Sequence, residues 1–282
     1  MSRIKGILFS VGLALAAVGS GIYAMQAQAA EAYKFGVVPQ FEARALSAIW
    51  IPILDELSRR TGLEFEMTGS PKIPDFEASY ERGEFDFAYM NPYHSLVAAR
   101  TQHYEPIIRD GGRELFGILV VHKDSPISKP EDLEGKRISF PAPNALGAAL
   151  LMRADLDSVF CVSFTPVYAA THTSSYLNVV LGQTEAGGGV MGTFNSQKAE
   201  IKDNLKIIYE TRRMPPHPVT AHPRVPKEHV ELVRKAFLEM AATEEGAAML
   251  AKVPIKKAVA ATLEDYKILN DWGLEDYYIH PN

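Results

Sequence analysis

The residues best suited to chemistry lie in short loops where predicted strands give way to helices. These residues are small, polar or aromatic, and they occupy Gln40-Phe41, Asn91 to His94, Pro143 to Gly147, Thr171 to Ser174 and Gly192-Thr193. Several of the loops open directly into helices, whose free N–H groups and positive dipole ends attract anions. The chemistry that they predict is the binding of a small anion.

The segment before Asn91 shows how such a loop is positioned. Aromatic residues alternate with other types from Phe85 to Tyr89, which predicts a short, mostly buried strand that Asn91-Pro92 ends. Ligands of open α/β sheets sit beyond the carboxyl ends of strands, so this loop, with Tyr93 and His94, is a predicted ligand loop. From the spacing alone, an ordinary connection with both side chains at the surface stays equally open.

The sequence contains no signature of catalysis. It lacks a Gly-x-Ser-x-Gly elbow, a His-Glu-x-x-His pair, a P-loop and a dinucleotide-binding glycine motif, so no catalytic residue is predicted. His217 and His222 share no spacing with a carboxylate that suggests three or four converging ligands. We therefore predict neither a metal site nor a cofactor. Cys161, between two apolar residues, is expected in the core.

The first residues form a secretory signal pattern. Arg3 and Lys5 precede an apolar run that extends to about Ala24, and Ala27-Gln28-Ala29 is a small-x-small cleavage pattern. We expect residues 1–29 to be a signal peptide and the mature protein to be soluble and periplasmic. An uncleaved membrane anchor is the alternative, because the apolar run is nearly long enough to span a bilayer.

Charge and cysteine content exclude several classes of protein. The signal segment carries two positive charges and no acidic residue, so the formal charge of −5 becomes −7 without it. An acidic chain without a basic cluster argues against a nucleic-acid partner. The single cysteine excludes an intramolecular disulfide, so the 47% of hydrophobic residues must supply a stabilising core.

Strand and helix patterns alternate along the first part of the chain. The predicted order is strand Tyr33–Val38, a helix with an apolar face from Leu46 to Leu57 that ends at Thr61-Gly62, strand Leu63–Met67, helix Phe76–Arg82 and the strand before Asn91. This order predicts a parallel sheet with right-handed crossovers. Tyr104–Ile108 is a further candidate strand.

A second alternating series follows the apolar run from Leu115 to Val121. It comprises a short helix capped by Ser128 with Glu131, strand Arg137–Phe140, helix Ala145–Asp157, strand Phe164–Tyr168, helix Ser174–Leu181, strand Glu185–Val190, a helix after Thr193 and strand Leu205–Tyr209. These elements suffice for a second sheet. Glycines 187–189 lie inside a predicted strand, where glycine indicates a close approach of backbone or ligand.

The three prolines from Met214 to Pro218 predict a linker that returns to the first lobe. Helical patterns follow at Val230–Met240, Glu244–Lys252 and Leu263–Trp272. The chain is therefore predicted to cross between two lobes twice, near Leu115–Lys123 and near Glu210–Pro218, which makes a hinge. The predicted lobes are residues 30–118 with 215–282, and residues 119–214.

Several segments together resemble a known family. They read Gly-Glu-Phe-Asp-Phe-Ala-Tyr-Met-Asn-Pro-Tyr, Phe-Gly-Ile-Leu-Val-Val-His-Lys-Asp-Ser-Pro-Ile, Leu-Glu-Gly-Lys-Arg-Ile-Ser-Phe, Thr-His-Thr-Ser-Ser-Tyr-Leu-Asn-Val-Val-Leu-Gly-Gln, and Pro-Pro-His-Pro with Ala-His-Pro-Arg-Val-Pro. From roughly Tyr33 to Tyr278 the chain resembles the phosphate/phosphite/phosphonate substrate-binding proteins of ABC transporters. The resemblance implies a type II periplasmic binding protein fold, with two α/β lobes on a two-crossing hinge, and no enzymatic activity.

The resemblance also implies roles for individual residues. His172 matches a family histidine that contacts phosphonate oxygens, and Phe76 stands where some members have a ligand-contacting tyrosine. Pro143-Asn144 matches the start of a Pro-Asn-Ser-Thr-Ser-Gly loop, whose three hydroxyl residues are Ala145, Leu146 and Gly147 here. Gly192 and His217 stand near positions where aminoalkylphosphonate binders carry carboxylates. A less polar anion, or a ligand with an apolar part facing Leu146, Phe76 and Phe116, fits this sequence better than an aminophosphonate.

We expect His172 and the helix start at Ala145–Gly147 to grip the anion, while Phe76, Tyr93 and His94 complete the opposite wall. The full set of predicted ligand residues is Phe76, Asn91, Tyr93, His94, Phe116, Asn144, Ala145, Leu146, Gly147, His172, Thr173, Thr193 and His217. The predicted partners are a small anion and an ABC transporter permease, with contact to the membrane only through that permease, and the protein is expected to be a monomer. A sensory protein that reports ligand occupancy to a membrane receptor or sensor kinase is the alternative.

Overall fold

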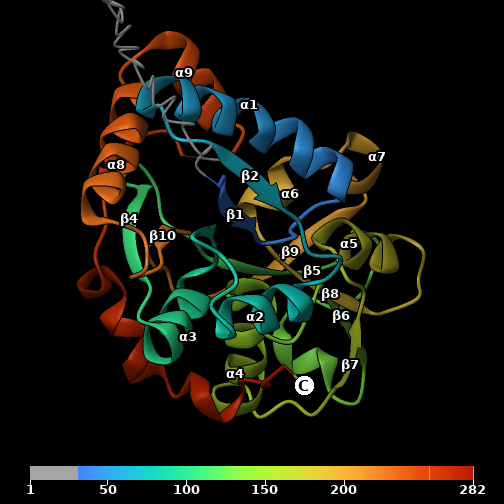
Figure 1. Ribbon diagram of the computed structural model, residues 1–282. Coiled ribbons are helices and arrows are strands. Elements are labelled where there is room, and N and C mark those ends of the chain that lie inside the picture. Colours follow the sequence, from blue (N-terminus) through green and yellow to red (C-terminus); the bar gives the residue numbers. More distant parts are fainter. Residues whose placement is uncertain (1–30, 254, 282) are drawn as a thin grey trace, which may run out of the picture. The chain divides into compact units, whose positions relative to one another are not determined.

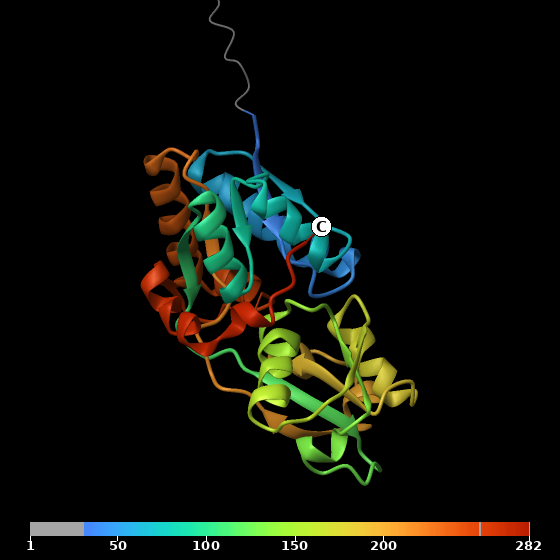
Figure 2. The same cartoon turned by 90° about the horizontal axis from the view of Figure 1, so that it is seen from below.

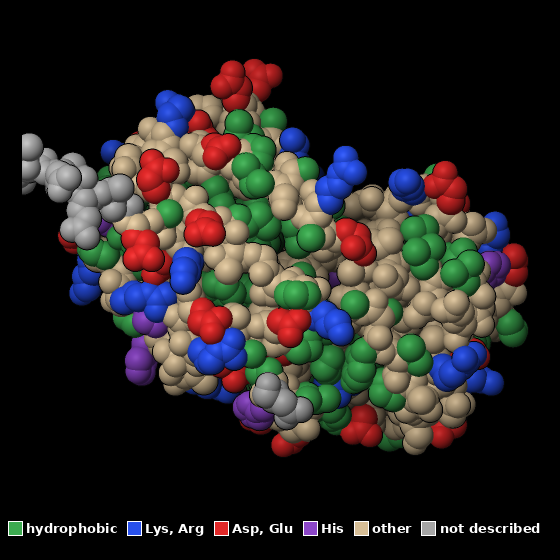
Figure 3. Space-filling view, turned by 45° about the vertical axis from the view of Figure 1, so that its right-hand side comes forward, with side chains coloured by type: hydrophobic (Ala, Val, Ile, Leu, Met, Phe, Trp, Pro, Cys, Tyr) green, Lys and Arg blue, Asp and Glu red, His purple; other side chains and the backbone are tan. Residues whose placement is uncertain are grey.

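The computed structural model describes residues 31–253 and 255–281 (Figure 1). The predicted signal peptide lies outside these residues. Within them, no helix combines the length and the apolar character needed to cross a membrane. Side chains of both charge signs are interspersed over the face seen in Figure 3, in keeping with the mixed composition of the chain.

Six strands form the first sheet, and its elements are called the first lobe below. In sheet order they are β11 (Ala258–Ala260), β4 (Glu105–Asp110), β10 (Val219–Ala221), β3 (Phe87–Tyr89), β1 (Tyr33–Val37) and β2 (Phe65–Thr68). Strand β1 pairs in parallel with β2 and β3, which confirms the predicted parallel arrangement. Strand β10 returns from the second lobe and inserts antiparallel between β3 and β4, so it closes the sheet from a distant part of the chain.

Helices pack on both faces of this sheet. They are α1 (Ala43–Thr61), α2 (Ile73–Glu81), α3 (Pro92–Gln102), α8 (Lys227–Ala241), α9 (Glu244–Leu250) and two 3₁₀ segments, η3 (Leu263–Trp272) and η4 (Leu274–Asp276). Phe35 of β1 contacts Trp50 of α1, whereas the neighbouring Gly36 faces Phe85, which stacks on Phe76 of α2. Alternate residues of one strand thus serve two faces, as a pleated strand requires.

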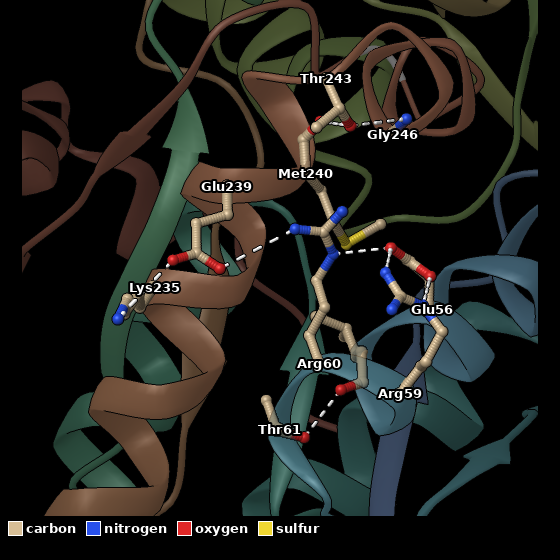
Figure 4. A network of polar contacts seen from close by, with 10 residues as sticks. Glu56, Arg59, Arg60, Thr61, Lys235, Glu239, Met240, Thr243 and Gly246 are labelled. Carbon is tan, nitrogen blue, oxygen red and sulfur yellow. Dashed lines mark hydrogen bonds and ion pairs between the residues drawn. The ribbon is translucent and has the colours of Figure 1, made fainter.

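Helix α1 is fixed by its apolar face, by its C-terminal cap and by an ion pair to α8. Five apolar side chains are buried along it, and Gly62 ends it in the left-handed conformation at φ 71°. Arg60 ties α1 to α8, because its guanidinium lies 2.6 Å from Glu56 and 3.8 Å from Glu239 (Figure 4). The predicted helix and its end at Gly62 are confirmed.

The second sheet has five strands, and its elements are called the second lobe below. In sheet order they are β7 (Thr165–Tyr168), β6 (Arg137–Phe140), β8 (Ala186–Val190), β5 (Gly117–His122) and β9 (Leu205–Glu210). Its helical elements are η1 (Pro130–Leu133), a π-helical turn Leu146–Leu150 that continues into α4 (Leu151–Ser158), α5 (His172–Val180), α6 (Met191–Asn195) and α7 (Ala199–Lys202). Figure 2 shows the two sheets with their helices as two lobes, one above the other.

The close packing of helices against strand β8 explains its run of glycines. A Cβ on Gly189 would meet the Tyr176 hydroxyl of α5 at 1.9 Å, and one on Gly188 would meet the Ala148 carbonyl oxygen at 2.0 Å. Helices therefore touch this strand on both faces, and no larger side chain fits at these positions. The close approach predicted for the glycine run is confirmed as one of backbone and side chains.

The two connections between the lobes lie side by side. Leu115 and Met214 exchange backbone hydrogen bonds of 2.8 and 2.9 Å just before β5 and just after β9. The predicted boundary between the lobes at residue 118 falls inside strand β5, which begins at Gly117. The predicted limits of the two lobes stay a prediction. Paired crossings of this kind are the usual form of a hinge between lobes.

Local predictions failed where chain geometry outweighed residue type. Cys161 is exposed rather than in the core, because it follows α4 in the left-handed conformation at φ 53°, which turns it outward. Ser128 is not the helix cap that we expected. Lys129 precedes the helix, and Asp132 accepts the N–H of Ser128 at 2.9 Å. The short strands β10 and β11 were not predicted. The helical prediction for Leu263–Trp272 is confirmed, and the helix there is of the 3₁₀ type.

Candidate ligand site

Two adjoining cavities lie among the strand-end loops. The inner chamber, of about 20 Å³, is lined by Val38, Gln40, Ile73, Asn91, Ala145, Leu146, Gly147, Ala148, His172, Val190 and His217. The outer chamber, of about 60 Å³, is lined by Gln40, Phe41, Tyr89, Asp110, Arg113, Glu114, Leu115, Phe116, Val190, Met191, Gly192, Thr193, Ser196, Pro216, His217, Lys252 and Ile255. On this measure one water needs roughly 10–15 Å³. The inner chamber therefore has room for one or two waters, and the two adjoining chambers together suit a ligand of few heavy atoms.

Three helix N-termini meet at the inner chamber. Asn91 caps α3, Ala145 precedes the π-helical turn that leads into α4, and His172 is the first residue of α5. The side chain of Asn91 accepts the N–H of His94 at 2.8 Å, and Thr171 accepts that of Ser174 at 3.1 Å. Each helix start adds a positive partial charge, which favours an anion. Helix α3 begins with Pro92, which has no N–H, and its His94 N–H is capped, so the starts at Ala145 and His172 are the better sources of free N–H groups.

Two glycines hold the helix start at Ala145 in place. A Cβ built on Gly117 of β5 would lie 1.9 Å from the carbonyl oxygen of Gly147. A Cβ on Gly147 would lie 3.0 Å from the amide nitrogen of Gly117 and 3.1 Å from Val190. The helix start therefore rests directly on strand β5, and its backbone rather than its side chains faces the chamber.

Two buried histidines line the inner chamber. Nδ1 of His172 lies 3.3 Å from the Thr193 hydroxyl, and Nε2 of His217 lies 3.3 Å from the Gln40 amide nitrogen. The His217 ring also stacks on Tyr89 with a centroid distance of 5.4 Å. Burial lowers the pKa of His172 to about 4 and, helped by nearby positive groups, that of His217 to about 3. Both imidazoles are therefore neutral at neutral pH.

Charged side chains are confined to the outer chamber. Arg113 and the buried Asp110 form an ion pair of 2.9 Å there, and Glu114 and Lys252 line the same cavity. The guanidinium of Arg213 lies 4.0 Å above the ring of Phe116, which also lines this cavity. Lys, Arg, Asp and Glu are missing from the described lining of the inner chamber. The described lining of the inner chamber is thus uncharged and mostly apolar, with Gln40, Asn91, His172 and His217 as its polar side chains.

A network of buried hydrogen bonds joins Glu77, His94, Asn144 and Asn91, and we call it the Glu77 network. Nε2 of His94 lies 2.8 Å from Glu77, whose other oxygen accepts the Asn144 amide at 3.0 Å. Asn144 exchanges two hydrogen bonds with the backbone of Ile279, at 2.6 and 2.9 Å, and its carbonyl oxygen accepts the Asn91 amide at 3.1 Å. The network joins α2 and α3 of the first lobe to a loop of the second.

The C-terminal segment contacts both lobes. Arg153 of α4 donates to the carbonyl oxygen of Tyr277 at 2.5 Å, while the Tyr278 hydroxyl lies 3.0 Å from that of Tyr80 and 3.2 Å from Glu81 on α2. In Figure 2 this red segment runs beside the helices of both lobes. We call this segment, residues 277–281, the strap, because it contacts elements on both sides of the boundary between the lobes.

Eight of the thirteen predicted ligand residues line a chamber. They are Asn91, Phe116, Ala145, Leu146, Gly147, His172, Thr193 and His217. The other five lie elsewhere. Phe76 is in the core, Tyr93 packs on Tyr278, His94 and Asn144 belong to the Glu77 network, and Thr173 is half-buried on α5.

The loop from Asn91 to His94 was predicted either to bind the ligand with Tyr93 and His94 or to be an ordinary surface connection. The structure matches neither alternative. Tyr93 is 1% exposed and His94 is fully buried, so the surface connection is wrong, yet neither side chain reaches a chamber. Helix α3 turns them toward α2 and the strap. Only Asn91 of this loop faces the inner chamber.

Sequence reasoning missed several lining residues. Asp110 ends β4, Arg113 follows it and Lys252 follows α9, all in segments that carried no motif. Glu77, which lines neither chamber, was hidden in an ordinary helical pattern. The signal available was positional, because β4 ends at the same edge of its sheet as the other ligand loops. Three or more His, Cys, Asp or Glu residues suited to a metal ion do not gather anywhere in the described chain.

Comparisons with known proteins agree with this geometry. Residues 35–266 match the family described as "ABC transporter, phosphonate, periplasmic substrate-binding protein". The chain is 20% identical over 237 residues to the phosphonates-binding periplasmic protein of Escherichia coli, covering 79% of this chain and 70% of that protein. It is 23% identical over 195 residues to the phosphate-import protein PhnD of Mycolicibacterium smegmatis, covering 61% of this chain and 60% of that protein.

A solved structure shows the same fold. PhnD1 from Prochlorococcus marinus, in complex with methylphosphonate, aligns with a TM-score of 0.79 at 16% identity and covers 88% of this chain and 99% of its own. The fold is that of the type II periplasmic binding proteins of ABC transporters, as predicted. The family is one of transport proteins rather than enzymes. The chain belongs to the periplasmic phosphonate substrate-binding proteins of ABC transporters.

Proposed function

We propose that this protein captures a small phosphorus oxyanion in the inner chamber and delivers it to a membrane permease. The observation that carries the proposal is the meeting of three helix N-termini, at Asn91, Ala145 and His172, on one small uncharged cavity. Backbone N–H groups and dipoles bind an anion at such a place without a formal counter-charge. The small volume favours ligands such as phosphate, phosphite or methylphosphonate over larger ones.

Capture requires that the ligand reach a buried site. Both chambers are lined by residues of both lobes, and the two crossings at Leu115 and Met214 lie side by side. We therefore infer that the lobes open about these crossings and close on the ligand, which stabilises the closed form by contacting both. The signal segment at residues 1–29 would direct the chain to the periplasm, where the permease meets it.

Calorimetric titration tests the proposal. The mature chain is titrated with phosphate, phosphite, methylphosphonate and, as a comparison, acetate. We expect saturable binding of at least one phosphorus oxyanion and weaker binding of acetate. Failure of all three phosphorus ligands to bind would overturn the assignment, and mass spectrometry of ligand retained through purification would then identify the class that does bind.

A further inference from the structure

The two chambers adjoin and differ in charge. They share three lining residues, which are Gln40, Val190 and His217. The inner chamber, of about 20 Å³, has no charged side chain in its described lining, whereas the outer chamber, of about 60 Å³, is lined by Asp110, Arg113, Glu114 and Lys252. A phosphorus oxyanion at the helix starts fills the inner chamber. Any substituent that this ligand carries must therefore extend into the charged outer chamber.

Arg113 is the positive group set deepest in the outer chamber. Its side chain is 32% exposed, whereas Lys252 is an exposed residue. Nε of Arg113 lies 2.9 Å from Oδ2 of Asp110, but the two atoms are not aligned as a hydrogen bond. Among the described residues, none accepts a hydrogen bond from the two terminal nitrogens of Arg113. The guanidinium is thus held by Asp110 on one side and has free donors on the other.

The carboxylates of the outer chamber offer little to a ligand cation. Oδ1 of Asp110 accepts the N–H groups of Gly112 and Lys257, each at 2.9 Å, and Oδ2 is the oxygen beside Arg113. Glu114 is exposed, so its charge can stay in water. The unmet hydrogen-bonding capacity within the chamber is therefore that of a cationic donor, which an anionic group satisfies best.

Gly192 leaves space open beside this guanidinium. A Cβ built on Gly192 would meet only Nη1 of Arg113, at 3.9 Å, among the described atoms. Gly192 belongs to α6 of the second lobe, whereas Arg113 follows β4 of the first. A ligand group in this space would contact both lobes, which is the condition for a ligand to stabilise the closed form.

We propose that the outer chamber is a second anion subsite, in which Arg113 binds a carboxylate that is attached to the phosphorus ligand. The proposal rests on the proposed function and gives its ligand a class, the short phosphonocarboxylates. A guanidinium pairs with a planar carboxylate through two parallel N–H···O bonds, so the subsite supplies specificity as well as affinity. The phosphorus group occupies the inner chamber, and the carboxylate occupies the space between Arg113 and Gly192.

The test uses three ligands that share a phosphonate group and differ in the charge at the other end. Phosphonoacetate ends in a carboxylate, phosphonoacetamide has the same size and shape without that charge, and aminoethylphosphonate ends in an ammonium group. Dissociation constants are measured by calorimetry on the mature chain at neutral pH. We expect phosphonoacetate to bind about tenfold to a hundredfold more tightly than phosphonoacetamide, and aminoethylphosphonate to bind most weakly.

Two variants assign the preference to Arg113, and the readout is the ratio of the affinities for phosphonoacetate and phosphonoacetamide. Arg113→Gln removes the free donors, so this ratio should fall to about one. Gly192→Asp leaves the Arg113–Asp110 pair in place and puts a carboxylate of the protein beside the guanidinium, so the ratio should fall here too. Because the two ligands have the same size, the added bulk affects both alike. Arg82→Gln, at an exposed arginine away from both chambers, should keep the ratio of the unchanged protein.

Each other outcome counts against a specific claim. Equal affinity for phosphonoacetate and phosphonoacetamide, or tighter binding of aminoethylphosphonate, overturns this inference and leaves the proposed function standing. A preference for phosphonoacetate that survives both Arg113→Gln and Gly192→Asp also overturns it, because Arg113 is then not the source. Absence of binding by all three ligands and by phosphate, phosphite and methylphosphonate removes the proposed function itself, and the inference with it.

Discussion

Two clusters of buried polar residues meet at the boundary between the lobes, and they solve the same problem differently. In the Glu77 network, His94 has a carboxylate 2.8 Å from its ring, and Asn144 fills the remaining oxygen of that carboxylate. At the inner chamber, His172 has only a hydroxyl neighbour and faces a cavity. In the first cluster the protein itself satisfies both carboxylate oxygens, although Nδ1 of His94 is buried without a hydrogen-bond partner. The second cluster faces a cavity that a ligand can fill.

The difference comes from one helix. Helix α2 places Glu77 against His94, whereas the elements around His172 bring no acidic side chain to its ring. Buried polar groups cost free energy unless they are paired, so the Glu77 network ties the lobes together while the chamber stays available for binding. Residue type at a strand end therefore does not decide between structural and binding roles. The side chain that a neighbouring element places opposite decides it.

The largest effect is expected when Glu77→Ala breaks the network. His94 and Asn144 would lose their shared acceptor while still buried, and each buried hydrogen-bonding group left without a partner costs about 1–3 kcal/mol. Urea unfolding measures the loss. Glu66→Ala, at an exposed residue of β2, is the matched control and should change stability by less than about 0.5 kcal/mol. A loss below about 1 kcal/mol for Glu77→Ala would mean that the network is not structural.

Replacing His172 by Ala should weaken ligand binding while changing the stability of the protein little. A hydrogen bond to a charged ligand contributes about 1.5–3 kcal/mol, so the dissociation constant for phosphite should rise between about tenfold and a hundredfold. Stability without ligand should change far less than in Glu77→Ala, since the lost partner is a single hydroxyl at 3.3 Å. Calorimetry and urea unfolding of the same sample check both halves. A variant that loses stability but retains affinity would reverse the roles assigned to the two clusters.

The sequence predicted the fold and the loops that carry these polar residues, but not which of the residues are structural and which face the ligand chamber. The strand-helix alternation, the two sheets and the loops that converge were all accessible, because burial patterns and glycine positions carry them. Asn91, Asn144, His94 and His172 looked alike in the sequence, since each is a polar residue just beyond a strand. Their different roles depend on which side chain stands opposite, such as Glu77 opposite His94, and that is a contact between separate elements that no local pattern encodes.

The same limit explains the misplaced wall of the predicted site. Phe76 and Tyr93 were expected beside the ligand because aromatic residues often line such pockets. Phe76 instead stacks on Phe85 at 5.2 Å, and Tyr93 packs on Tyr278 of the strap at 5.5 Å. The strap returns from the far end of the chain, so the partner that buries Tyr93 is separated from it by most of the sequence.

Acid sensitivity should distinguish the two clusters next. His172 and His217 have pKa values of about 4 and about 3 in the folded state, below the ordinary value of 6.5. The unfolded chain therefore binds protons first, so the stability held above about pH 6.5 is lost as pH falls toward these values. The expected slope is about 1.4 kcal/mol per pH unit for each histidine.

Urea unfolding of the ligand-free chain at a series of acidic pH values measures this slope. His172→Gln should reduce the slope by about half, because one of the two untitrated histidines is gone. His103→Gln, at an exposed position, serves as the control. If the free energy of unfolding falls with the same slope at acidic pH in His172→Gln as in the unchanged protein, groups other than His172 cause the loss of stability.

The smallest effect is expected at the strap, where Tyr278→Phe removes only a hydroxyl. That hydroxyl contacts Tyr80 at 3.0 Å and Glu81 at 3.2 Å, and the ring that packs on Tyr93 is retained. We expect a loss of about 0.5–1.5 kcal/mol in urea unfolding, with phosphite affinity changed by less than about twofold. Tyr168→Phe, at an exposed tyrosine of β7, is the control. Because the strap contacts both lobes but neither chamber, a large loss of affinity in Tyr278→Phe would contradict the separation of the two clusters and would place the strap in the closing of the site.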